Sequence, residues 1–144
     1  MKNKKSLNFF TPSTGNNLDT ILINAGISAG FPSPAGDFKQ ERISLDQELI
    51  KNKEATFFAR VSGESMINAG LEDGDLIVID RSIEPSNNKI AVCFIDGEFT
   101  VKRLIVKKNK IWLKPENSRY KPIEVKDNDQ LIIWGIVTNV IKKL

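Results

Sequence analysis

After residue 55 the chain consists of short apolar runs separated by turn residues, and this pattern limits the fold more than any other feature. The runs are rich in Val, Ile, Phe and Trp, which strands favour. Asp96-Gly97 predicts a tight hairpin, because a type I′ turn needs positive φ at both central residues. Lys108-Asn109 predicts the next tight turn. We therefore predict a compact, mostly antiparallel β domain with strands at 56–61, 76–80, 89–95, 99–106, 111–114 and 131–141.

The first 40 residues have a different composition. Segments 11–17 and 30–36 are rich in Pro, Gly, Ser, Thr and Asn, which break regular structure. We predict an extended arm over residues 1–40 and a β-rich domain over residues 41–144. The apolar stretch 18–23 within the arm suits either a turn of helix or a strand. Ser44 followed three residues later by Gln47 is a capping-box pattern, so a short helix is expected over residues 44–50.

Length and charge narrow the class of protein. A chain of 144 residues is long enough for one well-buried domain with an arm. Three of the 21 basic residues and one of the 18 acidic residues lie before residue 30, which leaves a nearly neutral body. We therefore expect no direct sequence-specific DNA binding. No apolar run approaches the roughly 20 residues of a membrane helix, and no secretory signal is visible, so we expect a cytoplasmic protein without membrane contact.

The chain contains no histidine, so it cannot build a Ser-His-Asp triad, and serine hydrolysis would need another base. Ser65 lies in Ser62-Gly63-Glu64-Ser65-Met66, and Lys102 lies in Thr100-Val101-Lys102-Arg103. Each has an ordinary structural explanation. Ser65 suits a turn or a helix cap, and Lys102 suits the solvated face of a strand. The opposite phase of that strand would bury Lys102, and periodicity alone does not choose between the two. The single cysteine, Cys93, is expected to be a packed core residue.

Longer motifs around these two residues resemble the peptidase domain of the LexA and UmuD family of self-cleaving proteins, and the UmuD-like members most of all. The similarity runs from about Gly30 to the C-terminus, and the 37 positions from Ser65 to Lys102 agree with that family. It implies a β fold of the LexA and signal-peptidase type with a Ser-Lys dyad. The motifs are Val61-Ser62-Gly63-Glu64-Ser65-Met66, Gly70-Leu71-Glu72-Asp73-Gly74-Asp75-Leu76 and Asp96-Gly97-Glu98-Phe99-Thr100-Val101-Lys102-Arg103-Leu104.

The implied chemistry makes Ser65 the nucleophile and Lys102 the general base. A lysine at its ordinary pKa of about 10.4 is protonated at neutral pH, but burial among apolar side chains lowers that pKa. Phe99, Val101 and Leu104 are candidates for such an apolar wall. The backbone amides of Ser65 and Glu64 are candidates for the oxyanion hole.

The resemblance also places the substrate within the same chain. It implies cleavage between Ala29 and Gly30, 36 residues before Ser65. Three other Ala-Gly pairs occur, but only this one is followed by Phe-Pro-Ser-Pro. Small residues on both sides of the bond suit a narrow cleft, and the prolines keep the arm extended.

Within the family, the segment before the peptidase domain separates the functions. The 29 residues before Gly30, many of them polar or turn-forming, are too few for the helix-turn-helix domain of a repressor. The resemblance therefore implies a homodimeric accessory subunit of an error-prone translesion DNA polymerase of the UmuC type in the SOS response. Its self-cleavage would be stimulated by the RecA filament on single-stranded DNA, leaving residues 30–144 as the active form. The alternative is a catalytically inert binding module of the same fold with a regulatory tail.

Other polar residues carry weaker hypotheses. Asp73, Asp75 and Asp80 are spaced as in a turn followed by a strand, and a calcium loop would need more oxygen ligands. We therefore expect neither a metal nor a cofactor. Trp112 and Trp134 are predicted to be core or dimer-interface residues rather than platforms on which bases stack.

Overall fold

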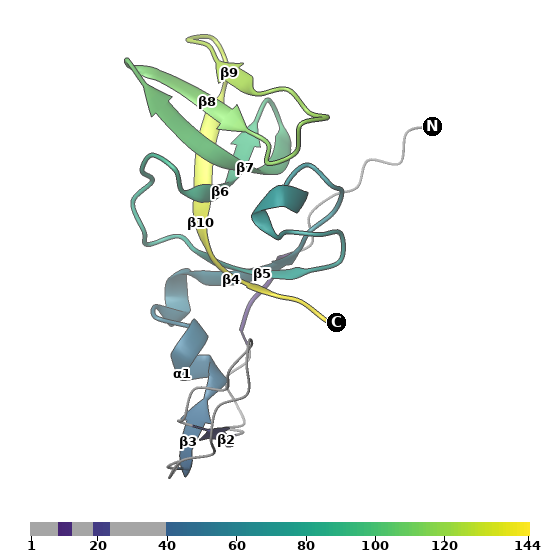
Figure 1. Cartoon of the computed structure of the whole chain (residues 1–144). Helices are drawn as coiled ribbons and strands as arrows, with labels where there is room; N and C mark the ends of the chain where they lie inside the picture. The colour runs from purple at the N-terminus through teal and green to yellow at the C-terminus, as the bar shows by residue number, and fades with distance from the viewer. Residues whose placement is uncertain (1–8, 13–18, 24–39) are drawn as a thin grey trace. The chain divides into compact units, whose positions relative to one another are not determined.

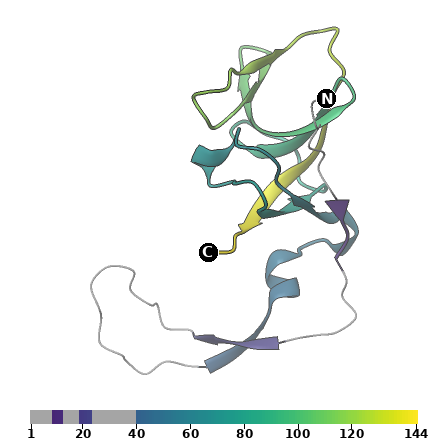
Figure 2. The ribbon, with the colours of Figure 1, turned by 90° about the vertical axis from the view of Figure 1, so that its right-hand side faces the viewer.

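The computed structural model describes residues 9–12, 19–23 and 40–144 of the chain. Its ribbon is shown from two directions in Figure 1 and Figure 2. The chain divides into two compact units. The larger unit contains Met1–Pro12 and Asn52–Leu144, and the smaller contains Ser13–Lys51. The boundary expected from composition, between residues 40 and 41, stays a prediction.

In its described residues, the larger unit is built on one eight-stranded sheet in which all neighbouring strands are antiparallel. The order across the sheet is β1-β4-β5-β10-β6-β7-β8-β9. This confirms the mostly antiparallel β fold. The strands are β1 (Phe9–Phe10), β4 (Thr56–Arg60), β5 (Leu76–Asp80), β6 (Ile90–Ile95), β7 (Glu98–Lys107), β8 (Lys110–Lys114), β9 (Ile123–Val125) and β10 (Leu131–Ile141).

The long strand β10, yellow in Figure 1, joins two parts of this sheet. Its first half pairs with β6 and its second half with β5. The register shifts between Ile133 and Gly135 and again between Val137 and Asn139, as at β-bulges. A Cβ atom at Gly135 would lie 2.6 Å from Cγ2 of Ile79. Glycine is therefore the residue that lets β10 approach β5 so closely.

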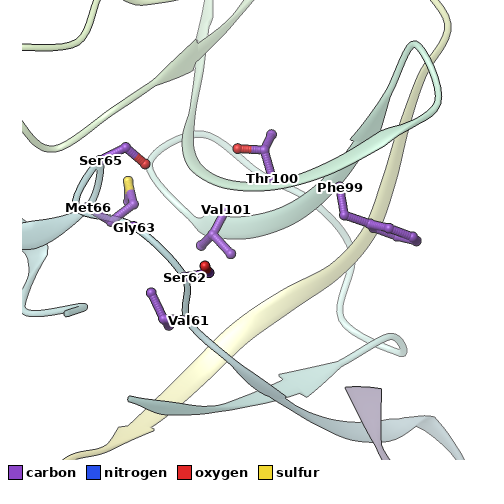
Figure 3. Close-up of a pocket in the computed structure, with 8 residues that line it drawn as sticks. All are labelled: Val61, Ser62, Gly63, Ser65, Met66, Phe99, Thr100 and Val101. Atoms are coloured by element: carbon purple, nitrogen blue, oxygen red, sulfur yellow. The ribbon is translucent and has the colours of Figure 1, made fainter. Parts of the chain in front are cut away.

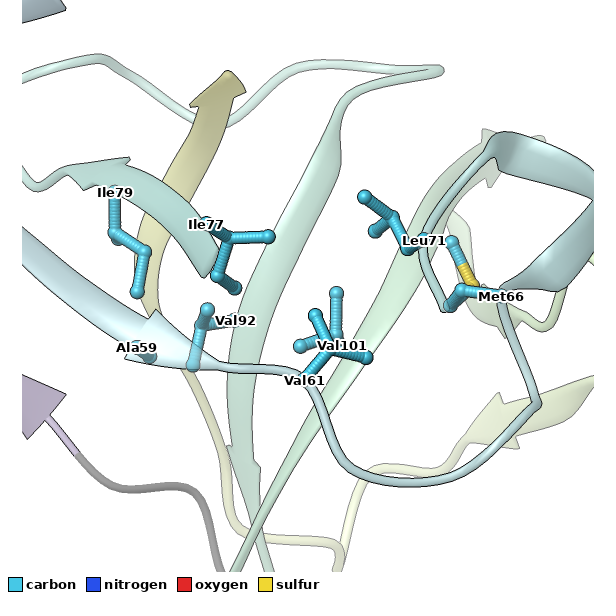
Figure 4. Close-up of a cluster of buried hydrophobic side chains, with 8 residues drawn as sticks. All are labelled: Ala59, Val61, Met66, Leu71, Ile77, Ile79, Val92 and Val101. Atoms are coloured by element: carbon cyan, nitrogen blue, oxygen red, sulfur yellow. The ribbon is translucent and has the colours of Figure 1, made fainter. Parts of the chain in front are cut away.

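Hydrophobic side chains cover both faces of the central strands. Val92 belongs to one buried cluster, and its neighbours Ala91 and Cys93 belong to another, because successive strand residues point to opposite faces. The first cluster, shown in Figure 4, consists of Ala59, Val61, Met66, Leu71, Ile77, Ile79, Val92 and Val101. The second consists of Ala91, Cys93, Leu104, Leu113 and Ile136. Cys93 is thus a core residue, as predicted.

The smaller unit contains an antiparallel pair of strands, β2 (Asp19–Ile23) and β3 (Gln40–Ser44). The apolar stretch in the arm is thus a strand rather than a turn of helix. Helix α1 (Leu45–Leu49) follows β3. The Ser44 side chain accepts a hydrogen bond of 3.5 Å from the amide of Gln47, which confirms the predicted cap.

Local turn signals explain how neighbouring strands are joined. Asp96 and Gly97 have φ of +47° and +83°, and Lys108 and Asn109 have φ of +47° and +62°. Both predicted hairpins are confirmed. The short strands β1 and β9 were not predicted. The larger unit also contains the 3₁₀ turns η1 (Lys53–Ala55) and η2 (Ile67–Ala69). Among the described residues, no helix is both long and apolar enough to cross a membrane.

Candidate active site

The turn between β4 and η2 carries Ser65. Gly63 has φ of +92°, a left-handed conformation that side-chain-bearing residues rarely adopt. Its amide donates a hydrogen bond of 2.7 Å to Oδ1 of Asp73. Val61 exchanges two backbone hydrogen bonds of 2.8 Å with residues 74–75. The turn is therefore fastened at its start to the turn that precedes β5.

A segment distant in sequence holds the other side of the Ser65 turn. Asn117 donates through Nδ2 to the carbonyl of Glu64 at 2.8 Å. The amide of Asn68 donates to the carbonyl of Glu116 at 2.8 Å, and the amide of Glu116 lies 3.4 Å from Sδ of Met66. No pattern in the sequence indicated this contribution. Residues 116 and 117 follow no hydrophobic period and stand about 50 positions away, so no local pattern identifies them.

Lys102 lies on β7 and meets Ser65 across the site. Its Nζ is 3.0 Å from Ser65 Oγ, 2.7 Å from Thr100 Oγ1 and 3.1 Å from the carbonyl of Val101. In the strand ladder Lys102 lies opposite Ala91 of β6. The fold thus brings together the two residues that the sequence singled out, and it adds Thr100 to them.

Burial resolves the question that periodicity left open. Val101 and Lys102 are 7% and 9% exposed, so β7 is covered on both faces here and neither simple alternation holds. Because burial disfavours the ammonium form, the pKa of Lys102 is lowered from its ordinary value. Burial also raises the pKa of the Cys93 thiol to about 11. Cys93 is therefore a neutral thiol at physiological pH.

A cavity of about 180 Å³ opens beside Ser65. Figure 3 shows the hydroxyls of Ser65 and Thr100 pointing toward one another, each from its own side of this cavity. Of the three residues expected to form an apolar wall, Val101 and Leu104 are buried, whereas Phe99 is 40% exposed. The cavity is lined by Val61, Ser62, Gly63, Ser65, Met66, Phe99, Thr100 and Val101.

The two backbone amides expected to form an oxyanion hole lie in the same turn. Within residues 9–12, 19–23 and 40–144, neither Glu64 nor Ser65 donates its amide to another group. The amide of Gly63, in contrast, is engaged by Asp73. No described group thus competes for these two amides, and their use as an oxyanion hole stays a prediction.

The aspartates considered for a metal site have structural partners. Asp75 is buried and accepts a hydrogen bond from Lys142, which lowers its pKa, and the amide of Glu72 also donates to it at 2.8 Å. Asp80 accepts from the amide of Ser82 at 2.8 Å. These carboxylates hold turns together. In the described part of the chain, no group of three or more acidic, cysteine or histidine side chains is arranged to hold a metal.

Ala29 and Gly30, the residues of the expected cleavage site, lie outside the described residues. The structure therefore gives no geometry for the bond that the resemblance singles out, and cleavage there stays a prediction.

The kind of protein, a self-cleaving serine peptidase, follows from a family match. The Peptidase S24-like family model matches residues 21–138, and the chain belongs to that family. Relatives include Protein MucA of Escherichia coli, 41% identical over 78% of this chain and 77% of its own length, and Protein SamA of Salmonella typhimurium, 44% identical over 80% and 79%. LexA repressor 1 of Geobacter sulfurreducens is 34% identical over 82% of this chain and 58% of its own length. These matches confirm the resemblance to UmuD-like proteins.

Proposed function

We propose that the chain is an autoproteolytic serine endopeptidase that cuts its own Ala29-Gly30 bond, with Ser65 as nucleophile and Lys102 as general base. The observation that carries the proposal is the 3.0 Å separation of Lys102 Nζ and Ser65 Oγ at a buried lysine. A serine hydroxyl is a weak nucleophile until a positioned base takes its proton.

The surroundings of Nζ fit a neutral amine. A neutral lysine has two N-H donors and one lone pair, in contrast to the three donors of an ammonium group. Thr100 Oγ1 at 2.7 Å and the Val101 carbonyl at 3.1 Å use the two donors. The lone pair is then directed to the remaining partner, the hydroxyl of Ser65. The site thus orients the base as well as lowering its pKa.

The reaction follows from these positions. Ser65 Oγ forms a bond to the carbonyl carbon of Ala29 while its proton passes to Lys102 Nζ. The amides of Ser65 and Glu64 stabilise the oxygen that becomes negative. The resulting ammonium then donates the proton to the nitrogen of Gly30 as the peptide bond breaks, and water hydrolyses the acyl-enzyme with Lys102 acting as base again.

The size of the cavity supports a small residue at the cleaved bond. A space of about 180 Å³ bounded by Val61, Met66 and Val101 accommodates an alanine side chain and its backbone more readily than a large side chain. Alanine before the cleaved bond and glycine after it fit this restriction.

The cellular role is also part of the proposal. We infer a homodimeric accessory subunit of a UmuC-type translesion polymerase in the SOS response, cleaved when it meets a RecA filament on single-stranded DNA, in the cytoplasm. The relatives support this role through the family that they share with the chain.

The intact mass of the purified chain, incubated at mildly alkaline pH, tests the chemistry. Cleavage should release a fragment of 115 residues beginning at Gly30, and Ser65→Ala and Lys102→Ala should each abolish it. Ser86→Ala and Lys107→Ala change exposed residues of the same types and should cleave normally. A wild type that stays intact even with RecA, ATP and single-stranded DNA would leave the inert binding module as the better explanation.

A further inference from the structure

Strand β1 occupies one edge of the main sheet next to a group of aromatic residues. Phe9 pairs with Ala59 of β4, and Phe10 pairs with Phe58. In Figure 2, β1 is the dark purple arrow beside the larger unit. Strand β1 stands first in the sheet order, so β4 would be the edge strand without it. An unpaired strand edge readily accepts another extended chain.

The side chain of Phe9 packs against two of these aromatic residues. Its ring centroid lies 4.7 Å from that of Trp134 and 5.0 Å from that of Phe99. Phe57 of β4 lies 5.0 Å from Trp134 on the same site. The next residue, Phe10, is 50% exposed. Strand β1 therefore packs against the rest of the unit through one aromatic side chain, while the next side chain is half exposed.

Trp134 is held in place independently of β1. The guanidinium of Arg81 lies 4.5 Å from the centre of its ring, and Arg81 Nε donates to the Trp134 carbonyl at 2.9 Å. Phe94 likewise supports Phe99, with ring centroids 4.9 Å apart. These contacts do not involve β1, so we expect Trp134 and Phe99 to keep their positions when β1 leaves, as a preformed binding site requires.

Strand β1 uses only part of the edge available to it. β4 spans five residues, Thr56–Arg60, but only Phe58 and Ala59 are paired with β1. A longer extended segment with an aromatic residue in the position of Phe9 would form the same aromatic contacts and pair along more of β4. Addition of a strand to a sheet edge, with one side chain in a pocket, is a common mode of peptide recognition.

We propose that the edge of β4 with Phe57, Phe99 and Trp134 is a strand-docking site for an extended, aromatic-bearing segment of a partner protein. Strand β1 fills this site in the intact chain. Although only two residues of β1 pair with β4, β1 competes well with a separate chain, because its covalent linkage gives it a high effective concentration at the site. On the proposed function, cleavage after Ala29 would cut that linkage, since Phe9 lies on the released side. The docking site itself does not depend on cleavage.

Trp134 provides a signal for the experiment. In a full-length chain carrying Ser65→Ala, no proteolysis occurs, so failure of the docking site is separate from failure of the proposed function. Adding Trp112→Phe leaves Trp134 as the only tryptophan. The probe is a peptide with the sequence of residues 6–12, Ser-Leu-Asn-Phe-Phe-Thr-Pro, titrated while Trp134 fluorescence is recorded.

Phe9→Ala should empty the site, and Phe10→Ala is its matched control on the same strand. A site that β1 fills about nine-tenths of the time is free one-tenth of the time, so its apparent Kd is about tenfold higher than that of an empty site. The Phe9→Ala chain should therefore bind the peptide about tenfold more tightly than the parent chain. Phe10→Ala should bind within about twofold of the parent, and circular dichroism should show that both variants are folded.

Three results would overturn the proposal. The peptide could bind the parent and Phe9→Ala chains equally, or it could bind Phe9→Ala as tightly after its own first phenylalanine is replaced by alanine as before. Sedimentation could also show that the parent chain self-associates and that Phe9→Ala abolishes the association. In that last case the occupant is β1 of a second copy rather than a segment of a partner.

Discussion

Replacing Thr100 with valine tests how the base is oriented. Thr100 Oγ1 lies 2.7 Å from Lys102 Nζ, and Figure 3 shows its hydroxyl facing Ser65. Valine has nearly the same shape and the same preference for strands, so β7 keeps its geometry while Nζ loses one acceptor. The variant therefore removes a single interaction from the proposed base and leaves the nucleophile unchanged.

The size of the effect follows from the bond that is lost. A hydrogen bond between neutral groups contributes about 0.5–1.5 kcal/mol, which corresponds to a rate change of about 2-fold to 12-fold. Cleavage at alkaline pH, where Lys102 is neutral, should fall by this factor. Thr100 also accepts from the ammonium form, and hydrogen bonds to charged groups are roughly twice as strong. Its loss should therefore lower the pKa of Lys102 further.

The assay is the rate of appearance of the 115-residue fragment, measured by intact mass from neutral to strongly alkaline pH. In the wild type this rate should rise with pH through the lowered pKa of Lys102, because only the neutral amine accepts the proton. In Thr100→Val the rise should occur at lower pH and reach a lower plateau. Thr100→Ser retains the hydroxyl and should stay close to wild type. If Thr100→Val matches wild type in both respects, Thr100 does not orient the base.

Three further variants test other parts of the structure. Asn117→Asp removes the donor that holds the carbonyl of Glu64, the residue before Ser65. The rate of cleavage, measured by intact mass, should fall about 2-fold to 12-fold. An unchanged rate would contradict a positioning role for Asn117. Lys102→Met should raise the free energy of unfolding, measured in urea at pH 7, by about 0.5–2 kcal/mol. Burial lowers the pKa of Lys102, so the stability gained by Lys102→Met should shrink as pH rises toward 10.5, where Lys102 loses its charge in the unfolded chain as well. A variant that is less stable than wild type at pH 7 would contradict the argument that burying the ammonium group is costly. Lys142→Met should lower the melting temperature at pH 7, and the difference should disappear as pH falls below 3.8 and through the lowered pKa of Asp75. Lys143→Met is the matched control and should melt like wild type at every pH.

Local signals predicted much of the fold. The Asp96-Gly97 and Lys108-Asn109 turns and the cap at Ser44 depend on the conformations of a few adjacent residues, so the sequence contains all that is needed to recognise them. The strand at 76–80 and the long strand at 131–141 were predicted with their observed bounds. Strands β1 and β9 are two and three residues long and form only against a partner, so no pattern of their own reveals them.

Some features of the candidate site could likewise be predicted from the sequence, and others could not. Ser65 and Lys102 were chosen by motif and by resemblance, but alternation along β7 could not say whether the lysine is buried. Its burial results from a strand that is covered on both faces, which depends on residues brought from elsewhere in the chain. The roles of Thr100 and Asn117 likewise required atomic positions. The order of residues was sufficient to propose a base and a nucleophile.

By itself, the sequence determined the class of fold, the family and the pair of residues on which the proposed chemistry depends. Turn chemistry, the period of two and the absence of histidine are properties of neighbouring residues or of composition. Only the tertiary structure decided that Lys102 is buried with its Nζ 3.0 Å from Ser65 Oγ, and that β1 pairs with β4 and places Phe9 against Trp134. Both depend on contacts between distant residues, because desolvation and the closing of a sheet edge arise only when separate parts of the chain come together.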